Sequence, residues 1–367
     1  MSKMRHVIVA GGGLALGSLL ALSGCGTGGS GSGSGSTQTY TGAGSRWDVE
    51  LASDNTFTIT HRPSASGAVD MTVNGTYQAL ASGFLKLTVG SATGTGAPSP
   101  GDAGYALNVP GYVFILKPID PNSDQIIPMI KSGSCPTSNV TANWVMVKAD
   151  AGADATDASR DFYGTFAFDT GTQTASLPSR YNFNQTDLGS QALASGTCKD
   201  GVLTVAGADM FLTDGAGAIV HLGVDTPNDP ADDQIVFGFA RQSVGSVNAL
   251  DGSYAGLLFD GSGGAGSKIM PVAVSCSSGS CTGNMVTDID NNVLSSDSVT
   301  ITLTTADNPS TGFVTGTIDS NQPGSTPGQL TCMVNLDAQG SGRNIMSCVG
   351  QSPGDNSQMF NVLLVSK

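Results

Sequence analysis

Apolar and polar residues alternate along several short segments of this chain. In 46–51 and 56–60 every second residue is apolar, and the turn-forming residues 53–55 separate these two segments. The segment 299–304 alternates in the same way. A period of two places the apolar side chains on one face of a β-strand. The pattern therefore predicts antiparallel strands with one buried and one exposed face, joined by short turns.

A longer pattern occurs three times: an apolar run, a turn that combines Pro with Asn or Gly and Asp, a Gln, and a second apolar run. The three copies lie at 113–127, 218–237 and 345–360. Each copy predicts a β-hairpin, because the turn residues suit a tight corner and the apolar runs suit paired strands. A second repeat, Ala-Leu-Ala-Ser-Gly followed by Leu-Thr-Val, occurs at 79–89 and 192–205. We therefore expect an all-β fold of repeated antiparallel meander units, as small barrels or sandwiches, with little helix beyond the N-terminal segment.

The repeats divide the folded part into three β units, which we expect at 39–148, 161–241 and 251–367. Small and polar residues fill 149–157, which is typical of a linker between units. A chain of this length usually exceeds a single core, which also favours several units. The periodicity leaves open whether the units are separate barrels or share one sheet.

The N-terminus predicts export. Two basic residues precede an apolar run over 7–22, and this run ends in Leu-Ser-Gly-Cys at 22–25. The order is typical of a signal peptide, here 1–24. Its last residues resemble the lipobox of bacterial lipoproteins, in which the thiol of the cysteine, here Cys25, receives diacylglycerol before cleavage. A transmembrane anchor is the alternative, but the apolar run is shorter than the roughly 20 residues that a spanning helix needs.

A Gly/Ser-rich tether follows over 25–38, and its composition predicts a flexible coil with a reach on the order of 20 Å. Gly26 rather than Asp follows the cysteine, which resembles the default sorting of lipoproteins to the outer membrane. The lipobox, the tether and the repeated meander together resemble uncharacterised β-rich lipoproteins of proteobacteria. The resemblance implies an outer-membrane lipoprotein that contacts the membrane through its N-terminal lipid, palmitate included, on the periplasmic or the surface face. It implies no activity.

The net charge of the chain excludes nucleic acids as partners. The chain has 29 Asp plus Glu and 15 Lys plus Arg. Without the predicted signal peptide 13 basic residues remain, so the net charge becomes −16. Such a chain repels nucleic-acid phosphates. Every acid except Glu50 is Asp, which favours turns over helix interiors, and the 51 glycines point the same way.

Six cysteines follow Cys25, and an even set in an oxidising compartment predicts disulfides. Cys276 and Cys281 lie at the facing ends of two expected strands, and opposed cysteines in a hairpin are within bridging distance. The other four fit the pairs Cys332–Cys348 and Cys135–Cys198, although sequence separation alone leaves other pairings open. We expect no cofactor, since a zinc site would need further ligands with suitable spacing.

Two acidic segments are candidate metal sites. The second copy of the repeated turn carries four carboxylates, at Asp225, Asp229, Asp232 and Asp233. The segment 288–297 resembles the opening of a calcium loop, but Val293 and Val299 stand where an EF-hand has Gly and Glu. For both segments the alternative interpretation is a set of solvated turn residues.

Two classes of function remain. His61 and His221 lie in expected strands, and nothing near them in the sequence predicts a catalytic triad. Repeated units favour a non-catalytic binding or structural module of the envelope that contacts another envelope protein or a polysaccharide. The alternative is a carboxylate-dependent envelope hydrolase, which would need two acids facing one cleft.

Overall fold

The structure is a computed structural model. It describes residues 37–42, 46–64, 67–118, 126–148, 161–205, 208–212, 219–222, 235–261 and 269–367. The expected signal peptide, Cys25 and nearly all of the tether lie outside these residues. Within them the regular structure is β, apart from two short 3₁₀ segments, Val247–Leu250 and Ala338–Gly340. No helix of the described part has the length and hydrophobicity to cross a membrane.

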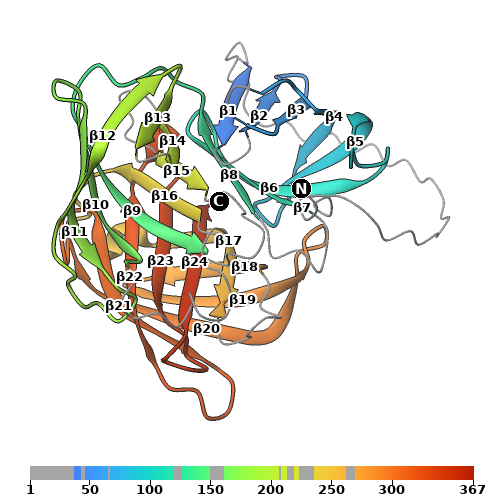
Figure 1. Ribbon diagram of the computed structural model, residues 1–367. Coiled ribbons are helices and arrows are strands. Elements are labelled where there is room, and N and C mark those ends of the chain that lie inside the picture. Colours follow the sequence, from blue (N-terminus) through green and yellow to red (C-terminus); the bar gives the residue numbers. More distant parts are fainter. Residues whose placement is uncertain are drawn as a thin grey trace.

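In the described part of the chain, twenty-four strands form three closed antiparallel barrels of eight strands each (Figure 1). Barrel 1 consists of β1 (Gln38–Gly42), β2 (Arg46–Leu51), β3 (Thr56–Arg62), β4 (Met71–Ala79), β5 (Leu85–Gly94), β6 (Ala103–Val109), β7 (Val113–Pro118) and β8 (Ile127–Lys131). Barrel 2 consists of β9 (Val140–Lys148), β10 (Tyr163–Asp169), β11 (Thr174–Tyr181), β12 (Gln191–Lys199), β13 (Val202–Val205), β14 (Ala208–Leu212), β15 (Ile219–Leu222) and β16 (Ile235–Ala240). Barrel 3 consists of β17 (Gly252–Asp260), β18 (Ile269–Ser277), β19 (Ser280–Asp288), β20 (Val293–Ala306), β21 (Phe313–Ser320), β22 (Gly328–Asn335), β23 (Ile345–Gln351) and β24 (Met359–Ser366). The predicted all-β class is confirmed, and the units are small barrels.

The first boundary differs from the expected one. Strand β9 pairs with β10 and β16, so it closes barrel 2, whereas barrel 1 closes through the pairing of β1 with β8. The expected unit 39–148 therefore contains one strand too many, and the expected linker 149–157 falls between β9 and β10, outside the described residues. The physical reason is that periodicity locates a strand but does not identify the distant strand to which it pairs.

The long sequence repeat corresponds to equivalent hairpins. Its three copies are β7–β8, β15–β16 and β23–β24, which are the seventh and eighth strands of their barrels in chain order. The turns of the first two copies lie outside the described residues. In the third turn the Ser352 amide donates to the Gln358 carbonyl at 2.9 Å, and the Gln358 amide donates to the Asp355 carbonyl at 2.8 Å.

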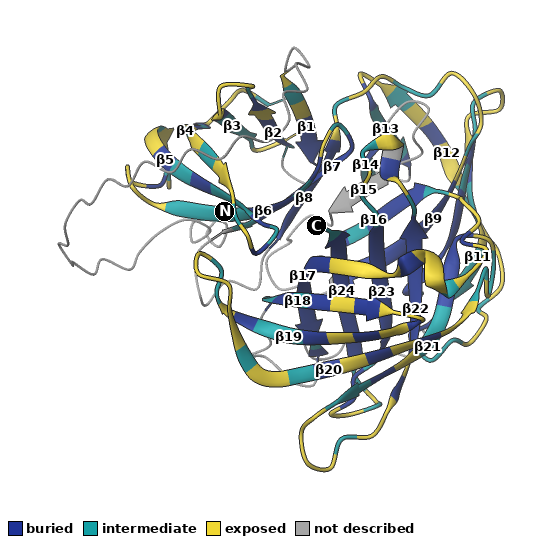
Figure 2. Ribbon diagram, turned by 180° about the vertical axis from the view of Figure 1, so that it is seen from behind, coloured by how far each residue is buried: buried dark blue, intermediate teal, exposed yellow. Residues whose placement is uncertain are grey.

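The strands where the barrels meet are buried on both faces. In β24, Phe360, Val362 and Leu364 pack inside barrel 3, whereas Leu363 and Val365 contact a core to which all three barrels contribute. Figure 2 shows β9 and β22–β24 almost entirely in the colour of buried residues. Burial on both faces produces continuous apolar runs in place of alternation. The three barrels therefore form one packed body.

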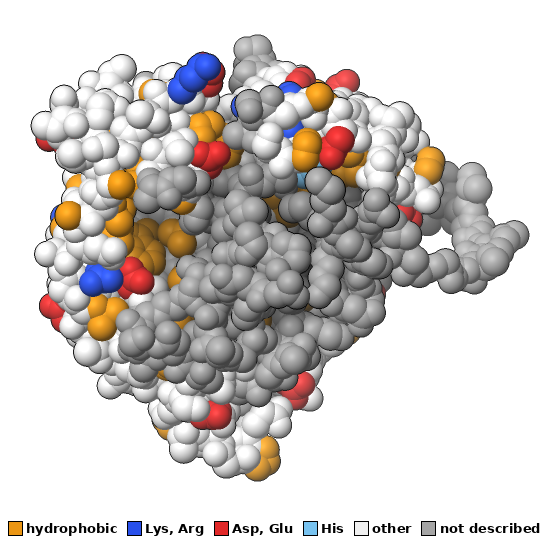
Figure 3. All heavy atoms as spheres, in the orientation of Figure 1, with side chains coloured by type: hydrophobic (Ala, Val, Ile, Leu, Met, Phe, Trp, Pro, Cys, Tyr) orange, Lys and Arg blue, Asp and Glu red, His pale blue; other side chains and the backbone are white. Residues whose placement is uncertain are grey.

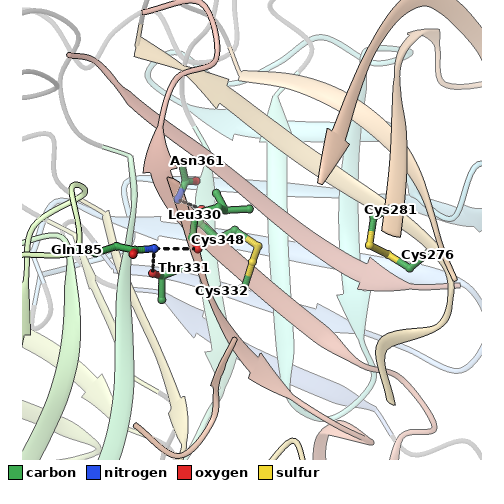
Figure 4. The surroundings of a disulfide bond; sticks show 8 residues. All are labelled: Gln185, Cys276, Cys281, Leu330, Thr331, Cys332, Cys348 and Asn361. Atoms are coloured by element: carbon green, nitrogen blue, oxygen red, sulfur yellow. Dashed lines mark hydrogen bonds between the residues drawn. A yellow bond between two sulfur atoms is a disulfide. The ribbon is translucent and has the colours of Figure 1, made fainter. Parts of the chain in front are cut away.

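One buried and one half-buried polar side chain join barrels 2 and 3. Asn361 of β24 donates from Nδ2 to the carbonyl oxygens of Met146 in β9 and Cys348 in β23, each at 2.9 Å. Gln185 of barrel 2 donates from Nε2 to Thr331 Oγ1 of barrel 3 at 3.2 Å (Figure 4). Polar groups in a dry wall need such partners, because an unpaired buried group costs about 1–3 kcal/mol. These bonds therefore fix how the two barrels meet.

Candidate functional site

The four acids of the second repeated turn, Asp225, Asp229, Asp232 and Asp233, lie outside the described residues, so a metal site there stays a prediction. Within the described ranges, no group of three or more His, Cys, Asp or Glu side chains is placed to hold a metal ion.

The acids of 288–297 stabilise turns and contacts between elements. Asp288 accepts from the backbone and side-chain nitrogens of Asn291 at 3.1 and 2.8 Å, and these hydrogen bonds lower its pKa. Asp290 forms an ion pair at 2.5 Å with Lys86 of barrel 1. Asp297 accepts from Gln322 Nε2 at 2.9 Å. Each of these carboxylates therefore has a separate structural role. Asp288 stabilises a turn, Asp290 links barrels 1 and 3, and Asp297 bonds to the neighbouring Gln322.

His61 is also engaged within its own barrel. It lies in β3 with Nδ1 2.6 Å from Asp70 Oδ1, and its ring packs 4.5 Å from the Trp47 ring. The backbone of His221 pairs within β15, but its side chain lies outside the described residues.

Three disulfides are present, and they join the same cysteines that the sequence analysis paired. Cys276–Cys281 and Cys332–Cys348 link directly opposed residues of neighbouring strands inside barrel 3 (Figure 4). Cys135–Cys198 joins the segment that follows β8 to β12 of barrel 2, across 63 residues. The first two disulfides belong to the core of barrel 3, and Cys135–Cys198 links the connection between barrels 1 and 2 to barrel 2.

The interior of barrel 3 is filled by side chains. Tyr254, Phe360 and both disulfides lie there among aliphatic residues, and each of them is at most 5% exposed. The Tyr254 hydroxyl donates to the Leu250 carbonyl at 2.7 Å, so its polar end is satisfied as well. Barrel 3 therefore has a filled interior, although Val247, Met270, Met285, Ala306 and Leu336 pack against it and stay partly exposed.

The interior of barrel 2 has a different composition. Three large rings, Trp144, Phe166 and Phe168, share it with Ala142 and Ala175 and with a few aliphatic residues. Further apolar side chains pack against this cluster and stay partly exposed: Val140, Leu177, Leu193, Met210 and Val236. Solvent therefore reaches side chains that face the barrel interior.

The pairing of β11 with β12 is irregular. Only three residue pairs join the two strands, including Leu177↔Gln191, and the register shifts along them. Both Leu177 of β11 and Leu193 of β12 contact the interior cluster while partly exposed. Figure 3 shows hydrophobic side chains in a hollow over the part of the molecule where β9 and β16 lie.

Trp144 is a member of this apolar cluster whose one side-chain polar group is buried and unpaired. The residue is 5% exposed, and its indole Nε1–H has no hydrogen-bond partner among the described residues. On the two neighbouring strands Trp144 stands opposite glycines, Gly164 of β10 and Gly238 of β16. Gly164 is required because the backbone of β11 at Ser179 approaches it too closely for a Cβ.

An eight-stranded barrel is just wide enough either to be filled by side chains or to hold one small ligand. Barrel 3 is the first case. The aromatic and small residues of barrel 2 and the unpaired donor of Trp144 fit the second case, because ligand sites are mostly apolar with a few placed polar groups. We take this interior as the candidate site. Sequence reasoning missed it, because Trp144 and Gly238 come together only through the pairing of β16 with β9.

No protein-family model and no curated protein matches this chain. Among solved structures, the isotype 1 transferrin binding protein B of Neisseria meningitidis serogroup B aligns with 88% of this chain at 13% identity and a TM-score of 0.26. A double mutant of transferrin binding protein B from Haemophilus parasuis Hp5 aligns with 90% at 9% identity and a TM-score of 0.26. The alignments span 66% of each of those chains. Likeness at this level carries no argument about the function of this chain.

Proposed function

We propose that this chain is a lipid-anchored protein of the bacterial outer membrane whose three-barrel body is a non-catalytic binding module. The anchor is supported by the lipobox-like residues that end in Cys25. The tether of 25–38 ends where β1 begins, so barrel 1 is the barrel next to the anchor. Its reach of about 20 Å lets the body meet an envelope protein or a polysaccharide.

The observation that carries the binding function is the apolar interior of barrel 2, in which three aromatic rings stand beside two alanines. Closed barrels packed on a shared core give that interior rigid walls, which limits the entropic cost of binding. The described carboxylates of 288–297 are engaged in turns and loop contacts, so they do not support the hydrolase alternative.

Two half-buried methionines provide a matched test. Met210 packs against the interior cluster of barrel 2, and Met285 packs against that of barrel 3. The lipidated protein in nanodiscs would be titrated with the neutral fluorescent probe N-phenyl-1-naphthylamine, and protein-free nanodiscs would be subtracted. We expect saturable binding at one site, weakened about tenfold by Met210→Trp and unchanged by Met285→Trp, because only the first ring enters the ligand space.

Three results would contradict this function: no saturable binding, equal weakening by both substitutions, or hydrolytic turnover of ester substrates by the purified protein. The anchor has its own test. A palmitate analogue should label the wild-type protein in cells and not Cys25→Ala, and equal labelling of both would refute the anchor.

A further inference from the structure

The disulfide in the connection between barrels 1 and 2 differs from the other two in its access to solvent. We infer that residues 132–139, which we call the strap, form a redox-sensitive latch. Reduction of Cys135–Cys198 by a dithiol releases the strap from one end of barrel 2. This regulation goes beyond the proposed binding function and does not depend on it.

The strap lies along one end of barrel 2. Antiparallel pairing brings the β12–β13 turn, the β10–β11 turn and the start of β9 to this end. At the first turn, Gly201 lies so close to the strap that an added Cβ would be 2.3 Å from the Gly133 carbonyl oxygen. At the second turn, Asn139 Oδ1 accepts from the Thr170 amide at 2.9 Å. The strap therefore reaches from one turn to the other before the chain enters β9.

Between these two ends the strap is a surface segment. It has no regular secondary structure, and its residues are exposed except for Ser132, Cys135 and Pro136, which are half-buried. Cys198, to which Cys135 is bonded, packs against the apolar cluster of barrel 2. The disulfide therefore draws the middle of the strap onto the barrel. Because the strap takes no part in the strand pairing of barrel 2, its release leaves the barrel closed.

Accessibility separates this disulfide from the two in barrel 3. The four cysteines of barrel 3 lie in its core and are at most 5% exposed. Both Cys135 and Cys198 are half-buried, so solvent reaches this pair. Thiol–disulfide exchange requires a thiolate to reach a sulfur atom, and exposed disulfides are therefore the labile ones. A reductant that acts on the folded protein should thus cleave Cys135–Cys198 first.

The cleavage takes two exchange steps. A thiolate of the dithiol attacks one sulfur of Cys135–Cys198, the S–S bond breaks, and the released cysteine thiolate takes up a proton. The second thiolate of the reductant then attacks the mixed disulfide and releases the other cysteine, which is protonated in turn. The dithiol is oxidised to a disulfide, and its two electrons and two protons end on Cys135 and Cys198.

The test is to reduce the lipidated protein in nanodiscs with dithiothreitol under native conditions. At each time point the reaction is stopped with acid, and free thiols are labelled with N-ethylmaleimide in denaturant and located by mass spectrometry. We expect Cys135 and Cys198 to become free at least about tenfold faster than the cysteines of barrel 3. Amide hydrogen exchange should then rise at least about tenfold within the strap and stay unchanged in the strands of barrel 2.

Two variants complete the test. The double variant Cys135→Ser with Cys198→Ser should show fast exchange in the strap without dithiothreitol and no further change with it. Asn139→Ala is the control, because it removes only the hydrogen bonds to Thr170 and should keep exchange around Cys135 slow until the disulfide is reduced.

Three results would overturn the latch: reduction of all three disulfides at one rate, no change of exchange in the strap on reduction, or a rise that spreads through the strands of barrel 2. The last would make the disulfide a support of the whole barrel. Reduction of the wild-type protein decides the question even where the double variant does not fold.

Discussion

In barrel 3, Tyr254, Phe360 and two disulfides fill the interior, whereas in barrel 2 Trp144 stands beside alanines and a glycine. Both barrels close with eight strands and share a buried wall. Their difference therefore lies in the side chains that face inward. Two barrels of the same fold can therefore differ in role. A few inward-facing residues decide whether the interior is a packed core or a candidate binding site.

The strongest test of this difference is to remove the same side-chain volume from both interiors by a Leu→Ala substitution in each. Leu330 in barrel 3 and Leu203 in barrel 2 are both fully buried. Leu330→Ala should lower the free energy of unfolding by about 5 kcal/mol, because its surroundings are closed and cannot relax, and Leu203→Ala by about 3 kcal/mol. Urea unfolding measures both. Equal losses would mean that the two interiors are equally well packed.

The disulfides differ between the two barrels in the length of chain that they close. The cysteines of Cys135–Cys198 are 63 positions apart in the sequence, and those of Cys276–Cys281 only five. Replacing both cysteines of the first pair by Ala should cost about 4 kcal/mol, and the same change in the second pair about 2 kcal/mol, if chain entropy dominates. Unfolding of the oxidised proteins tests this. A larger loss from the short pair would show that core packing in barrel 3 outweighs loop length.

The wall shared by barrels 2 and 3 gives a third test. Asn361→Ala leaves the carbonyl oxygens of Met146 and Cys348 without their side-chain donor, so we expect a loss of about 2 kcal/mol. Asn74→Ala is the control, because Asn74 is exposed and bonds only across the outer face of barrel 1. A loss no larger than that of the control would mean that water satisfies the wall and that the barrels are loosely joined.

Asp307, in the connection between barrels 2 and 3, predicts that the stability of the protein depends on pH. Partial burial raises the pKa of Asp307. Four hydrogen bonds to the carboxylate lower this pKa by more, so that it falls to about 2. The donors are the Ser243 hydroxyl and the backbone amides of Gly312, Val244 and Gly245. The ionised carboxylate therefore stabilises the folded state above its unfolded pKa of about 4. As the pH falls through about 2 we expect this contribution, about 1 kcal/mol after solvent screening, to disappear.

Asp307→Asn should remove that dependence. The urea midpoint of the wild-type protein should decline between about pH 4 and pH 2 more steeply than that of the variant. Parallel curves would show that the connection is not held by this carboxylate.

Alternation predicted strands well where one face meets solvent. The segments expected at 46–51 and 56–60 are β2 and β3, and their inward residues, Trp47 and Phe57 among them, fill barrel 1. The same local reasoning placed Cys276 opposite Cys281. In each case the information lies within a few residues, where periodicity and turn chemistry are sufficient.

Pairing over long distances could not be predicted in this way. Strand β9 is apolar on both faces, so its pattern does not show which side meets which barrel, and it was assigned to the wrong unit. The site in barrel 2 was missed for the same reason. Gly238 and Trp144 are neighbours only because β16 closes onto β9, and the sequence between them gives no sign of this.

The most direct test of the difference between the two barrels is a crystal structure of this protein under xenon pressure, since xenon occupies apolar space that side chains leave free. The account predicts xenon in barrel 2, in contact with Trp144, Ala142 and Met210, and none among the residues that fill barrel 3. Xenon inside barrel 3, or an interior of barrel 2 that takes up none, would contradict it.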